Sequence, residues 1–265
     1  MFSVFSRWWP RRSASSPQIG ADLWDAVWRS LPFLHWMSPT EQALLRERSR
    51  ELLGLKQING AAGLVLNDHI RLSIALQAAL PILHRGCEAY RNWAEIVVYP
   101  GDFIIPRQEV DENGVVHEYE ETLLGEAWIE GPVLVAWFEP EDGDRPEGIN
   151  VLIHEFVHTL DMGNGEVDGV PALPAEISYK EWQTTFAAAF TDFAQRLEAD
   201  PGWAEESPLD PYGAENPGEF LAVMSEHFFE TPAALAGLYP DVYRLLARYF
   251  GLDPLGPSSP GASQP

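Results

Sequence analysis

Two histidines and a glutamate stand at a spacing that suits metal chemistry, in the run His154-Glu155-Phe156-Val157-His158. On a helix, residues i and i+4 lie on one face about 6 Å apart, so both imidazoles can reach one Zn²⁺. Glu155 lies one residue round the helix, where its carboxylate can hold a metal-bound water. The run therefore supplies two candidate metal ligands and one candidate general base.

The residues around this run favour a metal site over a chance match. Val151, Ile153 and Leu160 are apolar, which indicates a buried helix, and Gly163 is placed to end it. Unpaired histidine and glutamate side chains would be costly in such a helix.

A catalytic zinc site commonly uses three protein ligands, so a third ligand is expected downstream. Cysteine ligands and a disulfide are excluded in practice, because Cys87 is the only cysteine. The predicted helix over 217–230 carries Glu219 and Glu226 on one face. From periodicity alone these two residues fit an ordinary solvated face equally well, and His227 competes as a ligand.

Several longer stretches carry a resemblance to a known family: AEIVVYPGDFIIP, LGEAWIEGPVLVAWFEPEDG, INVLIHEFVHTLDM and NPGEFLAVMSEHFFETP. Together they resemble the Mlc titration factor A family of zinc metallopeptidases, whose active site is related to the anthrax lethal-factor peptidase domain. The similarity extends from about Leu53 through Gly251. It implies a zincin-like metallopeptidase fold.

The resemblance assigns roles to residues of this chain. His154 and His158 match the two helical zinc ligands, Glu219 matches the third ligand, and Glu155 matches the catalytic base. One zinc ion per chain is implied.

Three further residues are candidates behind or beside the ligands. Tyr212 matches a tyrosine that stabilises the oxyanion of the transition state, the alternative being a plain turn residue. Asp161 matches a carboxylate that orients an imidazole, the alternative being a surface residue at a helix end. Glu226 is expected behind the ligands, and it or His227 is the next candidate ligand should Glu219 not bind the metal.

The implied activity is peptide-bond hydrolysis, aminopeptidase-like, by a zinc-bound water with Glu155 as general base. The resemblance also implies a transcriptional repressor of the Mlc type as a partner, besides a peptide or protein substrate. The alternative is a non-catalytic regulatory protein that sequesters a transcription factor, with structural zinc. Glu155 favours the enzyme, because folding around a metal needs ligands but no base.

The charge balance excludes other classes of partner. The chain has 40 acidic and 17 basic residues and a net charge of −23, which argues against a nucleic-acid groove or an anionic membrane surface. Residues 1–100 carry 11 basic and 8 acidic side chains, whereas residues 101–265 carry 6 and 32. The candidate site thus lies in a negative field that favours zinc and cationic peptide ends.

The order of patterns along the 265 residues predicts an α+β fold. It comprises a helical N-terminal part, a small mixed sheet, an active-site helix and C-terminal helices. We expect a flexible arm at 1–20, a single domain at 21–252, a disordered tail at 253–265 and, without a signal peptide or a long apolar run, a cytoplasmic location. Helices are expected at 38–53, 68–80, 150–162, 178–199, 217–230 and 240–250, and strands at 96–99, 103–105, 115–121 and 133–138.

The last of these strands, at 133–138, lies just before the active-site helix. It could bind extended substrate as an added strand, or it could be internal to the sheet.

Overall fold

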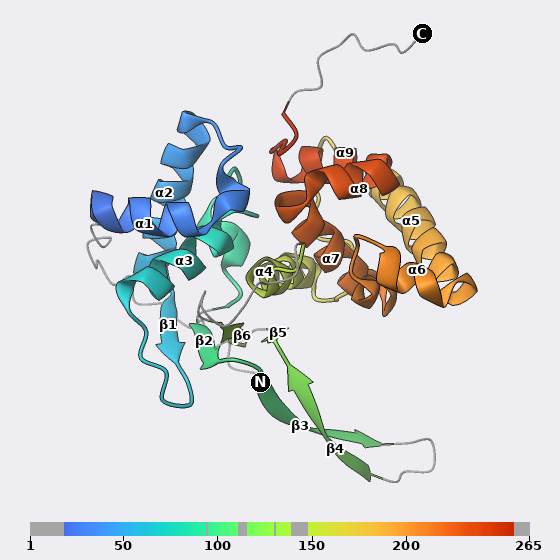
Figure 1. Cartoon of the computed structure of the whole chain (residues 1–265), viewed down its shortest axis with the longest axis horizontal. Coiled ribbons are helices and arrows are strands. Elements are labelled where there is room, and N and C mark those ends of the chain that lie inside the picture. The colour runs from blue at the N-terminus through green and yellow to red at the C-terminus, as the bar shows by residue number, and fades with distance from the viewer. Residues whose placement is uncertain (1–18, 94, 111–115, 130, 139–147, 257–265) are drawn as a thin grey trace, which may run out of the picture.

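The computed structural model describes residues 19–93, 95–110, 116–129, 131–138 and 148–256. The predicted arm and tail therefore lie largely outside the described residues. Helices from the two ends of the chain form two groups, and helix α4 (Val151–Asp161) runs between them, above a small sheet (Figure 1). The fold is a mixed α+β arrangement, as the sequence predicts.

The predicted helices are all present, with ends within a few residues of the expected ones. Within the described ranges, none of them is long and apolar enough to span a membrane. The helices before α4 are α1 (Ala21–Ser30), α2 (Pro39–Leu55) and α3 (Asp68–Ala79), with 3₁₀ turns η1 (Pro32–Leu34) and η2 (Cys87–Tyr90). Those after α4 are α5 (Tyr179–Ala199), α6 (Pro201–Glu206), α7 (Pro217–Glu230), α8 (Pro232–Leu238) and α9 (Pro240–Phe250), with 3₁₀ turns η4 (Met162–Asn164) and η5 (Pro211–Ala214).

Four strands form the sheet beneath α4, in the order β1-β2-β6-β5. The strands are β1 (Gln57–Gly60), β2 (Glu95–Pro100), β5 (Gly125–Ala127) and β6 (Val133–Trp137). The pairs β1–β2 and β2–β6 are parallel and β5–β6 is antiparallel, so the sheet is mixed. Strand β5 is its outer strand on the side of α4 and the candidate site.

Strand β6 does not offer an edge to substrate. It pairs with β2 through Ile96–Val133 and with β5 through Ala127–Val133, so its backbone is hydrogen-bonded on both sides. All five of its residues are buried. The idea that 133–138 binds an added strand is therefore wrong, and the alternative, that this strand is internal to the sheet, is confirmed.

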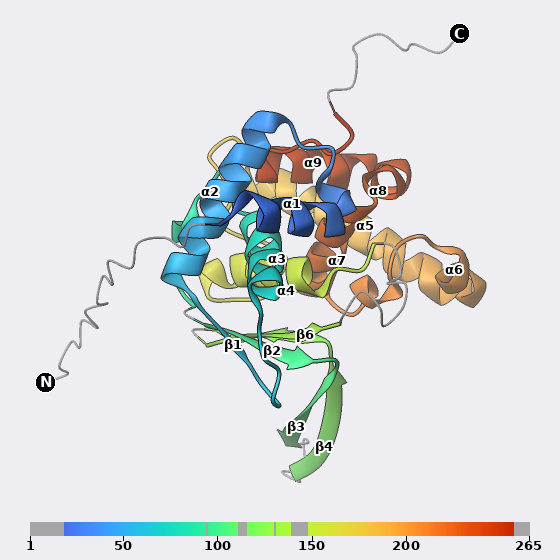
Figure 2. The ribbon, with the colours of Figure 1, turned by 60° about the vertical axis from the view of Figure 1, so that its left-hand side comes forward.

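The other two predicted strands form a separate hairpin. Strand β3 (Phe103–Val110) pairs antiparallel with β4 (Val116–Leu123), and the hairpin projects away from the body of the molecule (Figure 2). The strands that the sequence did not indicate, β1 and β5, are only four and three residues long. Segments this short, containing glycine, show too little alternation to be detected.

Helix α4 is anchored by its apolar face. Phe156, between the two histidines in sequence, is fully buried, and its ring centroid lies 5.5 Å from that of Tyr90 and 5.6 Å from that of Trp93. Aromatic packing of this kind fixes the rotation of the helix. The opposite face, with the histidines, is thereby presented to α7.

Helix α2 begins with a capping box formed by Ser38 and Glu41. The Ser38 hydroxyl accepts a hydrogen bond from the Glu41 N–H at 3.3 Å, and the Glu41 carboxylate accepts one from the Ser38 N–H at 2.7 Å. Replacing Ser38 by Ala should lower the free energy of unfolding by about 1 kcal/mol, since backbone donors lose a partner. Urea denaturation would measure it. The exposed Thr40→Ala, in the same turn, is the control, and an equal loss in both variants would contradict the assignment.

Candidate metal centre and active site

Helix α4 carries the histidines, and its first turn is held by Asn150. The Asn150 side chain caps the helix by accepting a hydrogen bond from the Ile153 N–H at 3.1 Å. Residues 154 and 158 follow one turn apart on the face that meets α7. Their imidazole rings lie edge to face with centroids 4.7 Å apart.

Helix α7 supplies the carboxylate. Asn216 caps it by accepting hydrogen bonds from the N–H groups of Gly218 and Glu219, at 2.9 and 3.0 Å, which orients the first turn. Oε2 of Glu219 then lies 2.8 Å from Nε2 of His154 and 3.1 Å from Nε2 of His158. The two Nε2 atoms are 3.0 Å apart.

This arrangement fits a divalent metal. Two imidazole nitrogens and one carboxylate oxygen, all potential electron-pair donors, lie within 4.8 Å of one another. Two unprotonated nitrogens at hydrogen-bond distance repel unless a cation or a proton lies between them. Two histidines and one carboxylate are also a common ligand set of catalytic zinc. His154, His158 and Glu219 are therefore the residues that would hold the ion.

Glu226 orients His154 from behind. Its Oε1 lies 2.8 Å from Nδ1 of His154, and its Oε2 accepts a hydrogen bond from the backbone N–H of Asn150. Because a carboxylate only accepts, Nδ1 of His154 must carry the proton, which leaves the Nε2 lone pair for a metal. The side chain that sequence reasoning placed behind the ligands thus contacts one of them directly.

A buried amide network joins this carboxylate to the first helices. The Asn150 side-chain amide donates to Oε1 of Gln77 at 2.8 Å and to Oε1 of Glu230 at 2.7 Å. Asn150 and Gln77 are each 2% exposed. Sequence reasoning assigned no site role to either residue, although an asparagine just before an apolar helix is a recognisable capping signal.

Glu155 faces the cavity beside the ligands rather than joining them. Burial raises the pKa of its carboxyl to about 8, with His154 lowering it and the carboxylates Glu219 and Glu226 adding to the rise. A bound cation would act in the opposite direction. Strand β5 passes so close that a Cβ on Gly125 would lie 2.4 Å from Oε1 of Glu155, so a larger residue at 125 would displace the carboxylate.

The ligands themselves are strongly coupled. Burial works to raise the pKa of Glu219, but hydrogen bonds with His154 and His158 lower it to about 2. Burial likewise opposes protonation of His154, yet its hydrogen bonds with Glu219 and Glu226 raise its pKa well above the usual range. The carboxylates therefore stabilise positive charge at the point where the three ligand atoms meet.

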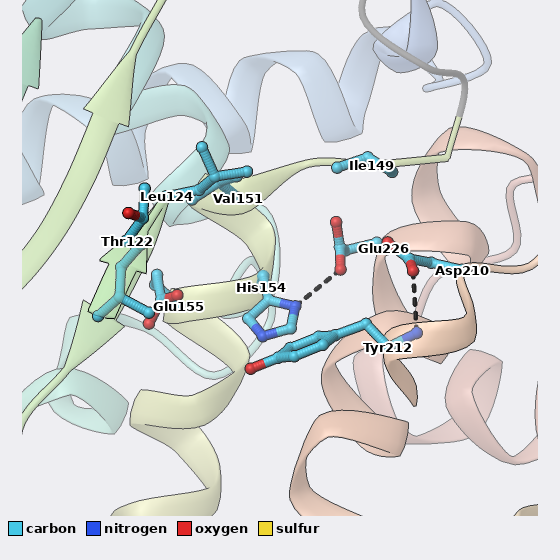
Figure 3. A pocket seen from close by; sticks show the side chains of 11 residues that line it. Thr122, Leu124, Ile149, Val151, His154, Glu155, Asp210, Tyr212 and Glu226 are labelled. Atoms are coloured by element: carbon cyan, nitrogen blue, oxygen red, sulfur yellow. Dashed lines mark hydrogen bonds and ion pairs between the residues drawn. The ribbon is translucent and has the colours of Figure 1, made fainter. Parts of the chain in front are cut away.

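Tyr212 covers the histidines from the turn η5. Its ring centroid lies 6.0 Å from that of His154, and the ring lies beside the imidazole with the hydroxyl directed toward α4 (Figure 3). The turn is held by Asp210, whose Oδ1 accepts a hydrogen bond from the Tyr212 N–H at 2.9 Å. Tyr212 is 49% exposed at the mouth of the cavity.

His227 points away from the metal ligands. Its Nε2 accepts a hydrogen bond from the Asp210 N–H at 3.2 Å, and its Nδ1 lies 2.7 Å from the Thr231 hydroxyl. Burial lowers the pKa of His227 to about 4, so it is neutral and serves as this acceptor. Instead of competing for the metal, it tethers the turn that carries Tyr212.

Asp161 lies at the end of α4, fully buried. Its Oδ2 accepts a hydrogen bond from the Gly169 N–H at 2.8 Å. Among the described residues, Oδ1 of Asp161 and Nδ1 of His158 have no hydrogen-bond partner. Burial excludes the surface alternative, whereas the role of Asp161 in orienting His158 stays a prediction.

Comparisons with known proteins match this chain to a metallopeptidase family. The model of the family described as glucose-regulated metallo-peptidase M90 matches residues 5–251. The chain is 33% identical to Mlc titration factor A of Pectobacterium atrosepticum over 249 residues, 93% of this chain and 92% of that protein. It is 34% identical to Mlc titration factor A of Serratia proteamaculans over 227 residues, 85% of this chain and 86% of that protein. An uncharacterized protein of Synechocystis sp. is 38% identical over 237 residues, 88% of this chain and 84% of that protein.

Removing the carboxylate ligand should weaken metal binding. We expect Glu219→Ala to lower zinc affinity by about tenfold or more. Mutation of a residue that only supports a metal ligand typically lowers metal affinity by about 10–100-fold, and loss of a ligand itself should cost at least as much. Equilibrium dialysis with metal analysis would measure it. Glu215→Gln, an exposed carboxylate just before α7, is the control for negative charge. Equal zinc affinity in the wild type and Glu219→Ala would show that Glu219 is not a ligand.

Proposed function

The chain belongs to the family of glucose-regulated metallo-peptidases M90, and from this premise we propose that it is a zinc-dependent, aminopeptidase-like peptidase with a zincin-like fold. The observation that carries the proposal is that His154, His158 and Glu219 converge beside Glu155. Among the described residues, the buried Oε2 of Glu155 has no hydrogen-bond partner. A metal with a purely structural role would need the three ligands but no such carboxylate.

The residues divide the chemistry among them. His154, His158 and Glu219 would hold a zinc ion, whose Lewis acidity would polarise a carbonyl and lower the pKa of a water toward about 7. Glu155 accepts the proton of the attacking water and passes it to the leaving amine. Its position suits this exchange, because the carboxylate lines the cavity beside His154 and Glu219.

Tyr212 contributes a hydrogen bond to the oxyanion that forms from the scissile carbonyl. Its hydroxyl group is on the cavity side of His154, and the ring is exposed enough to meet substrate (Figure 3). The tether from His227 to Asp210 keeps the turn of Tyr212 against α7.

Extended substrate binds along strand β5. This strand ends the four-stranded sheet, and Gly125 brings its backbone against Glu155. A peptide that pairs with β5 places its own backbone, and so the scissile bond, across the ligands. Antiparallel pairing is favoured, since it is slightly the more stable of the two.

The acidic surroundings support recognition of a free amine. Glu126, on β5, lines the cavity together with Glu219 and Glu155. The field of these carboxylates attracts the cationic N-terminus of a peptide.

Binding of a repressor of the Mlc type is a second proposed function. It is supported by relatives that carry the name Mlc titration factor A and match this chain over nearly their whole length. A purely regulatory protein with structural zinc is the alternative to the enzyme.

Glu155→Gln separates the two possibilities. The variant keeps the size of the side chain but removes its basicity, so hydrolysis of peptides should fall by about 10²–10⁴-fold. Zinc content should match that of the wild type, and Glu166→Gln, an exposed residue, is the control. Undiminished hydrolysis by metal-loaded Glu155→Gln would refute the enzyme mechanism, and persistent capture of a repressor would favour the regulatory role.

Tyr212→Phe tests the oxyanion contact. Loss of one hydrogen-bond donor should lower kcat by about 10²–10³-fold with little change in KM, because the bond forms in the transition state. Steady-state kinetics on a peptide amide would measure it, with zinc content as a check. A change confined to KM would assign Tyr212 to substrate binding instead.

A further inference from the structure

Two hollows meet at the candidate active site. The larger has a volume of about 390 Å³ and the smaller about 260 Å³. They share Leu123, Gly125, His154, Glu155 and Tyr212, so they open on either side of the reacting groups. A polypeptide that crosses the reacting groups therefore passes both hollows.

The walls of the two hollows differ in polarity. Leu124, Ile149 and Val151 line the larger one, where Leu124 is 43% exposed and the other two are half-buried. Each hollow also contains two carboxylates of its own, Asp210 and Glu226 in the larger and Glu126 and Glu219 in the smaller. The exposed wall of the larger hollow is nevertheless mostly apolar, whereas more than half of the exposed wall of the smaller one is polar. Partly exposed apolar side chains in a concave site typically contact the apolar part of a ligand. The larger hollow therefore selects by hydrophobic contact.

The direction of β5 determines which part of a substrate reaches each hollow. Strand β5 runs from Gly125 to Ala127, and the larger hollow lies before its start, beside Thr122 and Leu124, whereas the smaller one lies beside Ala127. A peptide antiparallel to β5 enters with its N-terminal end at Ala127. Its chain then leaves past Leu124, after the scissile bond.

We infer that the hollow formed by Leu124, Ile149 and Val151 is a specificity subsite for a large apolar side chain on the residue that follows the scissile bond. The inference rests on the proposed peptidase function and names its substrate class: peptides with a bulky apolar residue at that position. Contacts come from three elements, the end of the hairpin, the segment before α4 and the first turn of α4 (Figure 3).

A peptide series tests the subsite directly. In Ala-Xaa-Ala-Ala, with Xaa as Gly, Leu, Phe or Asp, mass spectrometry locates the bond that is cut and kinetics give kcat/KM. Cleavage of the Ala–Xaa bond should be about 10–100-fold faster for Leu and Phe than for Gly or Asp. A flat profile, or a preference for an apolar residue before the cut bond, would overturn the inference.

Two variants remove the preference in different ways. Val151→Phe fills the hollow and Leu124→Ser removes part of its apolar wall, and each should reduce the Leu-to-Gly ratio by about tenfold. Val65→Phe is the matched control, because Val65 is 86% exposed and lines neither hollow. It should keep the ratio. An unchanged ratio in both Val151→Phe and Leu124→Ser contradicts the subsite.

Binding measurements keep the subsite separate from catalysis. If the zinc-loaded wild type cuts none of the peptides, the proposed peptidase function fails. Calorimetric titration of Glu155→Gln with the Leu and Gly peptides still measures the subsite. Tighter binding of the Leu peptide, lost when Val151→Phe is added, supports the inference, and equal binding of the two peptides overturns it.

Discussion

The contact between α4 and α7 is the constraint on which the rest of this structure depends. Helix α4 is buried, yet it carries His154, Glu155 and His158, and buried polar groups are costly unless they are paired. Helix α7 supplies the pairing through Glu219 and Glu226, which bracket His154 at 2.8 Å on each side. The surrounding elements keep these two helices at this separation.

Several local features serve that contact. Asn150 and Asn216 cap α4 and α7 with side-chain oxygens, so both helices begin at defined residues. The backbone of Asn150 also binds Glu226, and its amide reaches Gln77 on α3. The N-terminal helices are thereby connected to the metal ligands. Asn150 thus caps α4 and also holds Glu226, the carboxylate that contacts His154.

Electrostatics and strand geometry define the cavity that faces substrate. Glu155, Glu219 and Glu226 bring negative charge into a poorly solvated space, which a divalent cation offsets. Strand β5 covers this space, and Gly125 allows its backbone to approach Glu155. Two hollows, of which the larger has the more apolar wall, then lie on opposite sides of the same groups. The proposed metal ligands and the proposed specificity subsite therefore share a single cavity.

The sequence alone determined helices α2, α3, α4, α5, α7 and α9, the mixed α+β class and the His154–Glu155–His158 group, because helical periodicity and caps are local properties. It did not indicate the shorter helices α1, α6 and α8. The family resemblance selected Glu219. Only the tertiary structure separated the neighbours Glu226 and His227, which point to His154 and to the Asp210 turn respectively. The edge role of β5 was also invisible in the sequence. Strand order and side-chain partners depend on which segments meet in space. A strand of three residues, such as β5, is too short to show a periodic pattern in the sequence.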